Sequence, residues 1–166
     1  MLQAFRITTF LAFIALSPAL ALAQGASVAF GGLKQDTTLP VEVSADQLTV
    51  NQADGTAVFV GNVLVGQGEM RLSAGRVKVE YTSDGSGISR LFASEGVTLI
   101  NATDAAESQE AVYTIDSGNV VMTGEVLLTQ GGNALSGQKL VIDLKAGTGV
   151  MEGRVQTVFQ PGKAKN

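Results

Sequence analysis

Phe59-Val-Gly-Asn-Val-Leu-Val-Gly-Gln-Gly68 is the stretch of sequence that decides the fold. Apolar side chains alternate with other side chains along it, and one glycine, Gly61, interrupts the apolar row. A period of two is typical of a β-strand that buries one face. A glycine inside a strand often marks a bend. We therefore expect a curved strand whose odd-numbered residues face an apolar interior.

The same pattern recurs along the chain. Gly55–Tyr81 aligns without a gap on Gly118–Leu144, with identical residues at nine of 27 positions, including Gln67 and Gln130. A further copy of Val121–Val126 begins at Val150. The repeat predicts a unit of about 30 residues, made of a strand, a turn and a second strand. One such unit cannot bury its apolar side alone, so the units must stack on one another.

The rest of the patterned region also reads as short antiparallel strands separated by glycine-rich turns. No window of 11 residues after the first 23 keeps a helical apolar stripe; the best candidate, 104–110, is short and has no apolar face. These observations predict an all-β chain. The acidic residues of 104–110 are expected on an irregular, solvated segment.

One parity of the strands is consistently apolar, and its side chains are mostly medium-sized because aromatic residues make up only 5% of the chain. Small side chains and recurring glycines favour a trough or half-open roll, although a filled sandwich core would show the same alternation. The predicted lining consists of Phe59, Val63, Val65, Val77, Val79, Tyr81, Val97, Leu99, Tyr113, Ile115, Met122, Val126, Leu128, Leu140, Ile142, Leu144, Met151 and Val155.

Composition excludes several functions. The chain has no cysteine and no histidine, so disulfides, thiolate metal sites and histidine-dependent nucleophilic catalysis are impossible. With 15 acidic and 11 basic residues it also lacks the basic footprint of a nucleic-acid-binding protein. No cofactor motif is expected. A carboxylate-based glycosidase using Glu69 and Glu80 remains an alternative, which the shortage of aromatic residues disfavours.

The N-terminus has the pattern of a cleaved secretory signal peptide. Residues 1–23 carry one early positive charge, then an apolar run, and end in Ala21-Leu22-Ala23. We therefore expect export to the periplasm, followed by a flexible leader over 24–39. The patterned domain would span 40–160, with Pro40 at its start, and residues 161–166 would form a disordered tail.

Three segments carry a family resemblance: Pro40–Leu48, Phe59–Gly68 and Val121–Gln130. In order and spacing they resemble the LptA/OstA family of periplasmic lipopolysaccharide-transport proteins (organic solvent tolerance-like N-terminal domain). The resemblance covers about residues 40–160. It implies a curved, partly open antiparallel β-jellyroll built from the stacked repeats, whose apolar interior shields lipid acyl chains. It implies no enzymatic activity and no cofactor.

The resemblance also implies partners. These are lipopolysaccharide, through its lipid A acyl chains, and the inner-membrane-anchored and outer-membrane components of the transport machinery, with no nucleic acid. Edge strands would join copies head to tail, through Val41, Glu42 and Val43 at one end and Gln156, Thr157, Val158 and Phe159 at the other. The main alternative is a stacked-β structural or adhesin-like protein with a filled core and no lipid. If the chain carries lipid, Val63→Asp is expected to abolish lipid binding and to leave the β-sheet intact.

Overall fold

A computed structural model describes residues 26–29 and 34–160 of the chain. Strands are the only regular secondary structure among these residues, and all of their pairings are antiparallel. The strands are β1 (Ala26–Ala29), β2 (Glu42–Ser44), β3 (Gln47–Asn51), β4 (Thr56–Gln67), β5 (Met70–Tyr81), β6 (Ile88–Ser94), β7 (Val97–Asn101), β8 (Asp104–Ser108), β9 (Glu110–Thr114), β10 (Asn119–Gln130), β11 (Asn133–Asp143), β12 (Thr148–Glu152) and β13 (Gln156–Val158).

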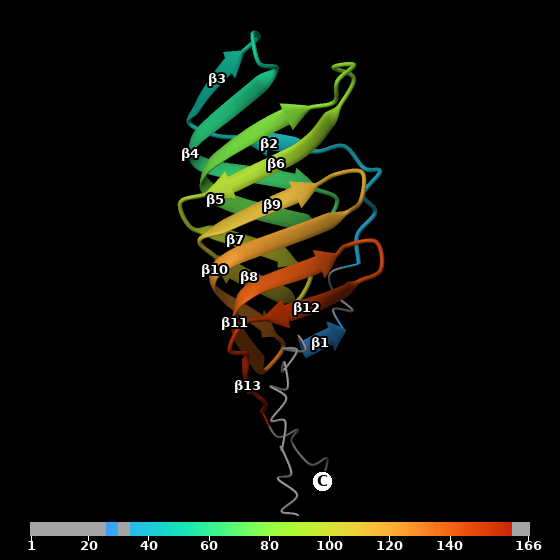
Figure 1. Cartoon of the computed structure of the whole chain (residues 1–166), viewed down its shortest axis with the longest axis vertical. Helices are drawn as coiled ribbons and strands as arrows, with labels where there is room; N and C mark the ends of the chain where they lie inside the picture. The colour runs from blue at the N-terminus through green and yellow to red at the C-terminus, as the bar shows by residue number, and fades with distance from the viewer. Residues whose placement is uncertain (1–25, 30–33, 161–166) are drawn as a thin grey trace, which may run out of the picture.

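The pairings divide the strands into two layers that share the four long strands β4, β5, β10 and β11. Layer A runs β3-β4-β5-β6-β9-β10-β11-β12-β1, and layer B runs β2-β4-β5-β7-β8-β10-β11-β13. Each long strand contributes one half to each layer. The strands stack crosswise along the long axis of the molecule, from β3 at one end to β12, β13 and β1 at the other (Figure 1). The expected all-β, antiparallel fold class is thus confirmed.

The long strands pass from one layer to the other at β-bulges. In β4, Gly61 has a φ of +80° and Asn62 a φ of +45°. The register with β5 jumps from Val60 opposite Arg76 to Val63 opposite Ala74, so two residues of β4 face one residue of β5. An extra residue of this kind bends a strand sharply. The glycine that the sequence marked as a bend is therefore the bend.

The bends of the long strands, which include Gly61 and Gly124, lie next to one another on one side of the molecule. We call this side the corner. The backbone N–H of Asp46 donates to the carbonyl of Gly61 at 2.9 Å, and that of Gln109 donates to the carbonyl of Gly124 at 3.0 Å. Gln109 in turn accepts the N–H of Gly96 at 3.4 Å. Backbone hydrogen bonds thus close the two layers on this side. On the opposite side, which we call the seam, the strands end in turns and no strand of one layer pairs with the other among the described residues.

The bends also change which residues face the interior. Inward residues of β5 are even-numbered before Gly75, as in Met70 and Leu72, and odd-numbered after it, as in Val77 and Val79. The strict period of two assumed from the sequence therefore missed half of the inward face of β5. The prediction that 104–110 is an irregular, solvated segment is also wrong. The segment belongs to strands β8 and β9, whose alanines and serine pair regularly but carry a weak hydropathy signal.

A matched pair of alanine substitutions tests the corner. Gly124 has a φ of +84°, and an added Cβ would lie 2.8 Å from the Cβ of Gln109. Gly124→Ala should therefore lower the free energy of unfolding by about 1–3 kcal/mol. Gly131 also has a positive φ, +57°, but an added Cβ there meets nothing within 4 Å. In urea unfolding, Gly131→Ala should lower the free energy of unfolding clearly less than Gly124→Ala does. Equal losses would contradict a crowded corner.

Candidate functional site

Most of the residues predicted to line a groove lie in the interior between the two layers. The buried ones are Val63, Val65, Val77, Val79, Val97, Leu99, Tyr113, Met122, Val126, Leu128, Leu140, Ile142, Leu144 and Met151. Phe59, Ile115 and Val155 pack at its margin and are half-buried. Tyr81 is 42% exposed, because the register of β5 shifts just before it. The interior also holds residues that the sequence did not assign: Ala57, Met70, Leu72, Ala74, Leu91, Ala93, Ala106, Ala111, Val120 and Leu135.

These side chains fill the interior. Residues such as Leu99, Leu140 and Ile142 have no exposed surface in the structure. The expectation that small side chains and glycines leave width between the walls is therefore wrong: the glycines bend the strands, and the aliphatic side chains form one buried cluster. Any guest in the interior requires the two layers to move apart. Since backbone pairing closes the corner, the seam is where they can part.

A segment of the chain lies along this seam. Residues 34–40, which we call the strap, run between β1 and β2 on the side of the molecule where the long strands turn (Figure 1). The backbone N–H of Gln35 donates to the carbonyl of Leu144 in layer A at 2.8 Å, while its side-chain amide donates to the carbonyl of Gln67 in layer B at 2.5 Å. The strap therefore bridges the two layers. The expectation of a flexible leader over these residues is wrong for the strap, whose polar, aperiodic sequence gives no pattern.

Gln67 is the centre of the polar contacts at the seam. It is buried at the end of β4, and its side-chain nitrogen donates to the carbonyls of Thr37 at 3.0 Å and Leu39 at 2.8 Å. Its side-chain oxygen accepts the hydroxyl of Tyr113, from layer A, at 2.6 Å. One amide thus holds the strap, layer A and layer B together. The signal in the sequence was a glutamine at the end of an otherwise apolar inward row, repeated at Gln130.

Buried polar side chains lie along much of the seam edge of layer B. Besides Gln67 they are Asn101 and Asp104 at the ends of β7 and β8, whereas Met70, which pairs with Gln67, is buried and apolar. Gln130 donates to the carboxylate of Asp104 at 3.0 Å, and Thr103 donates to its other oxygen at 3.3 Å. The side-chain oxygen of Asn101 is buried and has no hydrogen-bond partner. A polar border therefore separates the aliphatic interior from the surface.

The ionisation of Tyr113 provides a pH test of the closed seam. Burial raises the pKa of Tyr113 to about 12. A neutral phenol is favoured in the folded state, so this contribution to stability is complete below pH 10 and is lost as the pH rises toward 12. A pKa raised from 10.0 to about 12 corresponds to at most about 3 kcal/mol, and to less where water screens the phenolate.

The measurement uses Tyr81→Phe, in which Tyr113 is the one remaining tyrosine. Its ultraviolet titration should have a midpoint well above pH 10, and stability should fall over the same range. Adding Tyr113→Phe should remove this part of the alkaline loss. An ordinary midpoint near pH 10 would show that the seam is open to water.

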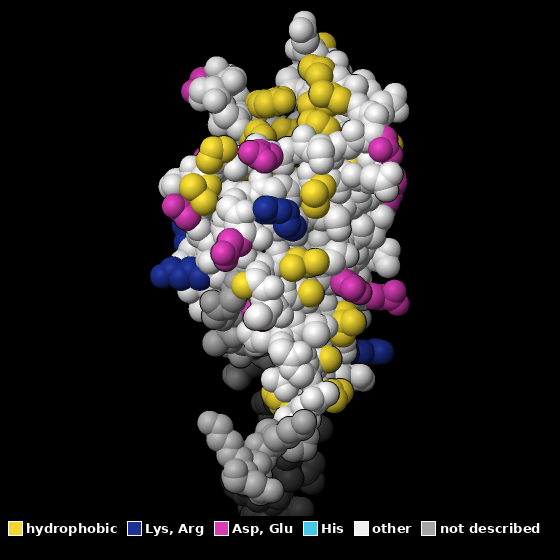
Figure 2. All heavy atoms as spheres, turned by 180° about the vertical axis from the view of Figure 1, so that it is seen from behind, with side chains coloured by type: hydrophobic (Ala, Val, Ile, Leu, Met, Phe, Trp, Pro, Cys, Tyr) yellow, Lys and Arg dark blue, Asp and Glu magenta, His cyan; other side chains and the backbone are white. Residues whose placement is uncertain are grey.

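The predicted pairing residues lie at opposite ends of the stack. β2 contains Glu42 and Val43 and pairs with β4, and β13 contains Gln156, Thr157 and Val158 and pairs with β11. Val41 precedes β2 and Phe159 follows β13. Among the described residues neither strand has a partner on its outer side, and β3 has none either. Apolar side chains gather at the β3 end (Figure 2); Leu48 and Val50 of that strand are 52% and 59% exposed.

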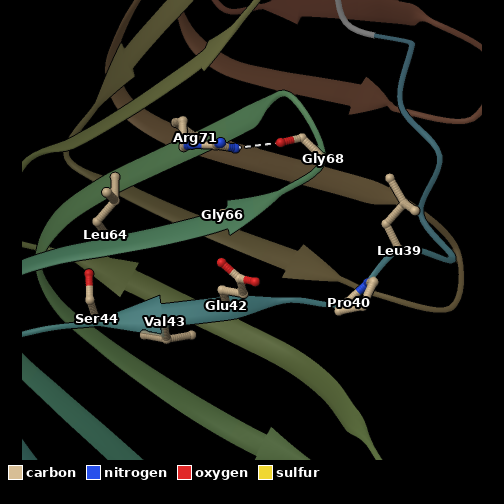
Figure 3. A pocket seen from close by; sticks show the side chains of 9 residues that line it. All are labelled: Leu39, Pro40, Glu42, Val43, Ser44, Leu64, Gly66, Gly68 and Arg71. Atoms are coloured by element: carbon tan, nitrogen blue, oxygen red, sulfur yellow. Dashed lines mark hydrogen bonds between the residues drawn. The ribbon is translucent and has the colours of Figure 1, made fainter.

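A surface hollow of about 580 Å³ lies beside β2. Figure 3 shows Glu42 and Ser44 on one side and Arg71 on the other. The Arg71 guanidinium donates to the carbonyls of Gly68 at 2.6 Å and Met70 at 2.7 Å. Its hydrogen bonds hold the β4–β5 turn. The hollow lies on the outside of layer B, separate from the interior.

The two carboxylates of the alternative glycosidase lie at opposite ends of one strand: Glu69 in the turn before β5 and Glu80 near the other end of β5. Glu80 forms ion pairs with Lys78 at 2.9 Å and Arg90 at 3.1 Å. In the described part of the chain no group of three or more acidic residues is placed to hold a metal ion. That part also contains no helix capable of crossing a membrane.

Comparison with known proteins agrees with this architecture. Residues 42–148 match the family model described as LptA/(LptD N-terminal domain) LPS transport protein. An uncharacterized protein of Rhizobium meliloti is 30% identical over 97% of this chain and 95% of its own length. The lipopolysaccharide export system protein LptH of Pseudomonas aeruginosa is 27% identical over 75% of this chain and 74% of its own. The crystal structure of LptH, described as the LptA homologous periplasmic component of the lipopolysaccharide transport device, superposes with a TM-score of 0.69 at 21% identity, covering 76% of this chain and 99% of that one.

Proposed function

Since the chain belongs to the LptA/LptD N-terminal-domain family of lipopolysaccharide transport proteins, we propose that it is a periplasmic bridge protein without enzymatic activity, which shields the acyl chains of lipopolysaccharide and passes the lipid from the inner to the outer membrane. Residues 1–23 would be the cleaved export signal and 40–160 the transport domain. The inner- and outer-membrane components of the transport machinery would be its partners.

The observation that carries this proposal is one apolar interior that runs the length of the stack, from Ala57 near β3 to Met151 in β12. Each methylene of an acyl chain kept from water contributes about 0.8 kcal/mol. A chain of roughly a dozen carbons therefore needs on the order of 10 kcal/mol, more than a few hydrogen bonds provide. A continuous aliphatic wall supplies it, and transfer along such a wall requires no bond to be made or broken.

The lipid would enter by separating the layers at the seam, with the corner as the hinge. The strap would oppose this separation. A few hydrogen bonds connect it to the two layers, through Gln67 and Leu144. Each contributes about 1 kcal/mol net. When the two layers separate, the acyl chain packs between them. The apolar side chains of each layer then contact the acyl chain instead of the other layer, so they remain shielded from water. The polar border of layer B would then meet the polar part of the lipid.

The number of strands in each layer is compatible with head-to-tail assembly. Without β1, each layer contains eight strands: β3, β4, β5, β6, β9, β10, β11 and β12 in layer A, and β2, β4, β5, β7, β8, β10, β11 and β13 in layer B. An even number means that a second copy in the same orientation meets the first with antiparallel edges in both layers. Such a stack would join β3 to β12 and β2 to β13, and would extend the apolar interior.

The filled interior favours a second candidate, a stacked-β structural protein that carries no lipid. Mass spectrometry of organic extracts separates the two. The chain purified from the periplasm of a lipopolysaccharide-producing bacterium should carry lipid A species at a substantial fraction of one per chain. A periplasmic β-protein of similar size, purified in the same way, is the control. Extracts free of lipid, together with no binding of added lipopolysaccharide, would support the structural role.

A further inference from the structure

The outer edge of β12 is occupied by the chain itself. β1 pairs with it in an antiparallel register that runs from Ala26 opposite Met151 to Ala29 opposite Thr148. β1 therefore lies at the far end of the stack from β2, although β2 is the next strand in the sequence (Figure 1). This pairing joins the first described residues of the chain to β12, the strand that would otherwise end layer A.

β1 has the orientation that an incoming strand would have. Layer A contains eight consecutive antiparallel steps from β3 to β1, so β1 and β3 run in the same direction. A second copy stacked head to tail would place its own β3 on β12 in that direction. The two strands thus compete for one set of backbone hydrogen-bonding groups.

We propose that β1 is an intramolecular edge cap, which the β3 strand of a second copy displaces when the chains assemble; this rests on the stacking described under the proposed function. A bare strand edge invites uncontrolled pairing, and natural proteins cover such edges. A tethered strand acts at an effective concentration in the millimolar range. The cap therefore holds the chain as a monomer when copies are dilute.

Displacement is favoured by the two-edged contact of an incoming copy. β1 spans four residues and covers the edge of layer A. The incoming chain presents five residues of β3 and, at the same time, β2 for the outer edge of β13 in layer B. It also buries Leu48 and Val50, which are half-exposed in the monomer. Because the cap continues into the strap, its release removes one anchor of the segment that lies over the seam.

Two opposed variants of the purified full chain test the cap. The first variant is Ser27→Pro/Val28→Pro. Along a strand the backbone N–H groups of successive residues point to opposite sides, so one of these two residues donates toward β12, and proline removes that N–H. Light scattering after gel filtration should then show dimers and longer stacks at a concentration about tenfold or more below that needed by the parent chain. Adding Val50→Asp, which spoils the incoming edge, should restore the monomer.

The second variant closes the cap. Ser27 and Val150 face each other in the register, and the chain has no other cysteine, so Ser27→Cys/Val150→Cys can form only this disulfide within one molecule. The oxidised form should stay monomeric at concentrations at which its reduced form assembles. The proposal is overturned if the proline variant assembles no more readily than the parent, or if oxidation leaves assembly unchanged. Lipid extraction from the same samples reports on the proposed function separately, because monomers can carry lipid.

Discussion

Leu99→Asp should leave the chain without a stable fold, whereas Ile100→Asp, at the next position of the same strand, should fold. Leu99 points into the interior from β7 and has no exposed surface, while Ile100 points outward and is 46% exposed. A carboxylate at position 99 would be buried, with the apolar Leu72 and Ala106 as its partners in register. A loss of more than about 4 kcal/mol is expected at this position.

The outward variant sets the scale for this comparison. An aspartate at position 100 meets water, and its cost is the low β-propensity of the residue, about 1 kcal/mol or less. Circular dichroism and urea unfolding of the two variants measure the difference directly. Since folded domains are stable by about 5–15 kcal/mol, the inward variant should show a lost or strongly shifted transition. Two similar transitions would mean that the interior admits water and is not a packed space.

A charged substitution at an inward position is not a specific test of lipid binding. Val63 is buried beside the bulge of β4, so Val63→Asp should damage the fold as well as any lipid site. This burial argues against the sequence-based expectation that the substitution removes lipid binding and leaves the sheet intact. A charged substitution at an inward position would abolish function whether the interior is a lipid groove or a packed core, so this result does not distinguish the two. A test has to follow the movement of the layers, with the interior left intact.

The alternation of the sequence was sufficient for the fold class and for most of the interior. Strand residues such as Val65, Leu128 and Ile142 face inward as their parity predicts, because a packed sheet admits apolar side chains on one face only. Parity failed at the bends. A bulge shifts the register of one strand relative to its neighbour, and sequence alone did not place the shift opposite Gly75, which reverses the inward face of β5.

Segments held by their backbone were beyond prediction. β1 is only four residues long, and the strap contacts the layers mainly through carbonyl and amide groups, which every residue carries. Such contacts leave no hydropathy pattern. Gln67 could have been found, because a glutamine repeated at the same place in two copies of an apolar row requires a polar partner. The free ends of the stack were recognised, but the capping of one of them by β1 was not.

Lipid binding should widen the seam and leave the spacing within each layer unchanged. Ser117 in the β9–β10 turn of layer A and Glu69 in the β4–β5 turn of layer B flank the strap, since the adjoining Gly118 and Gly68 approach Thr37 and Leu39. Both side chains are exposed. The absence of native cysteine allows clean spin labelling of Ser117→Cys/Glu69→Cys. An acyl chain inserted between packed walls requires at least one further layer of carbon atoms, so the label-to-label distance should grow by roughly 4 Å or more.

The matched control is Ser83→Cys/Ser117→Cys, whose labels lie in two turns of layer A. Backbone pairing through β6 and β9 connects these turns, so their distance should stay the same when lipopolysaccharide is added. Because the two layers are hinged at the corner, a rigid separation moves the seam more than any other part. Widening of both pairs would indicate unfolding by the amphiphile. An unchanged seam in a sample shown by extraction to hold lipid would place that lipid outside the interior, and the proposed transport route between the layers would have to be abandoned.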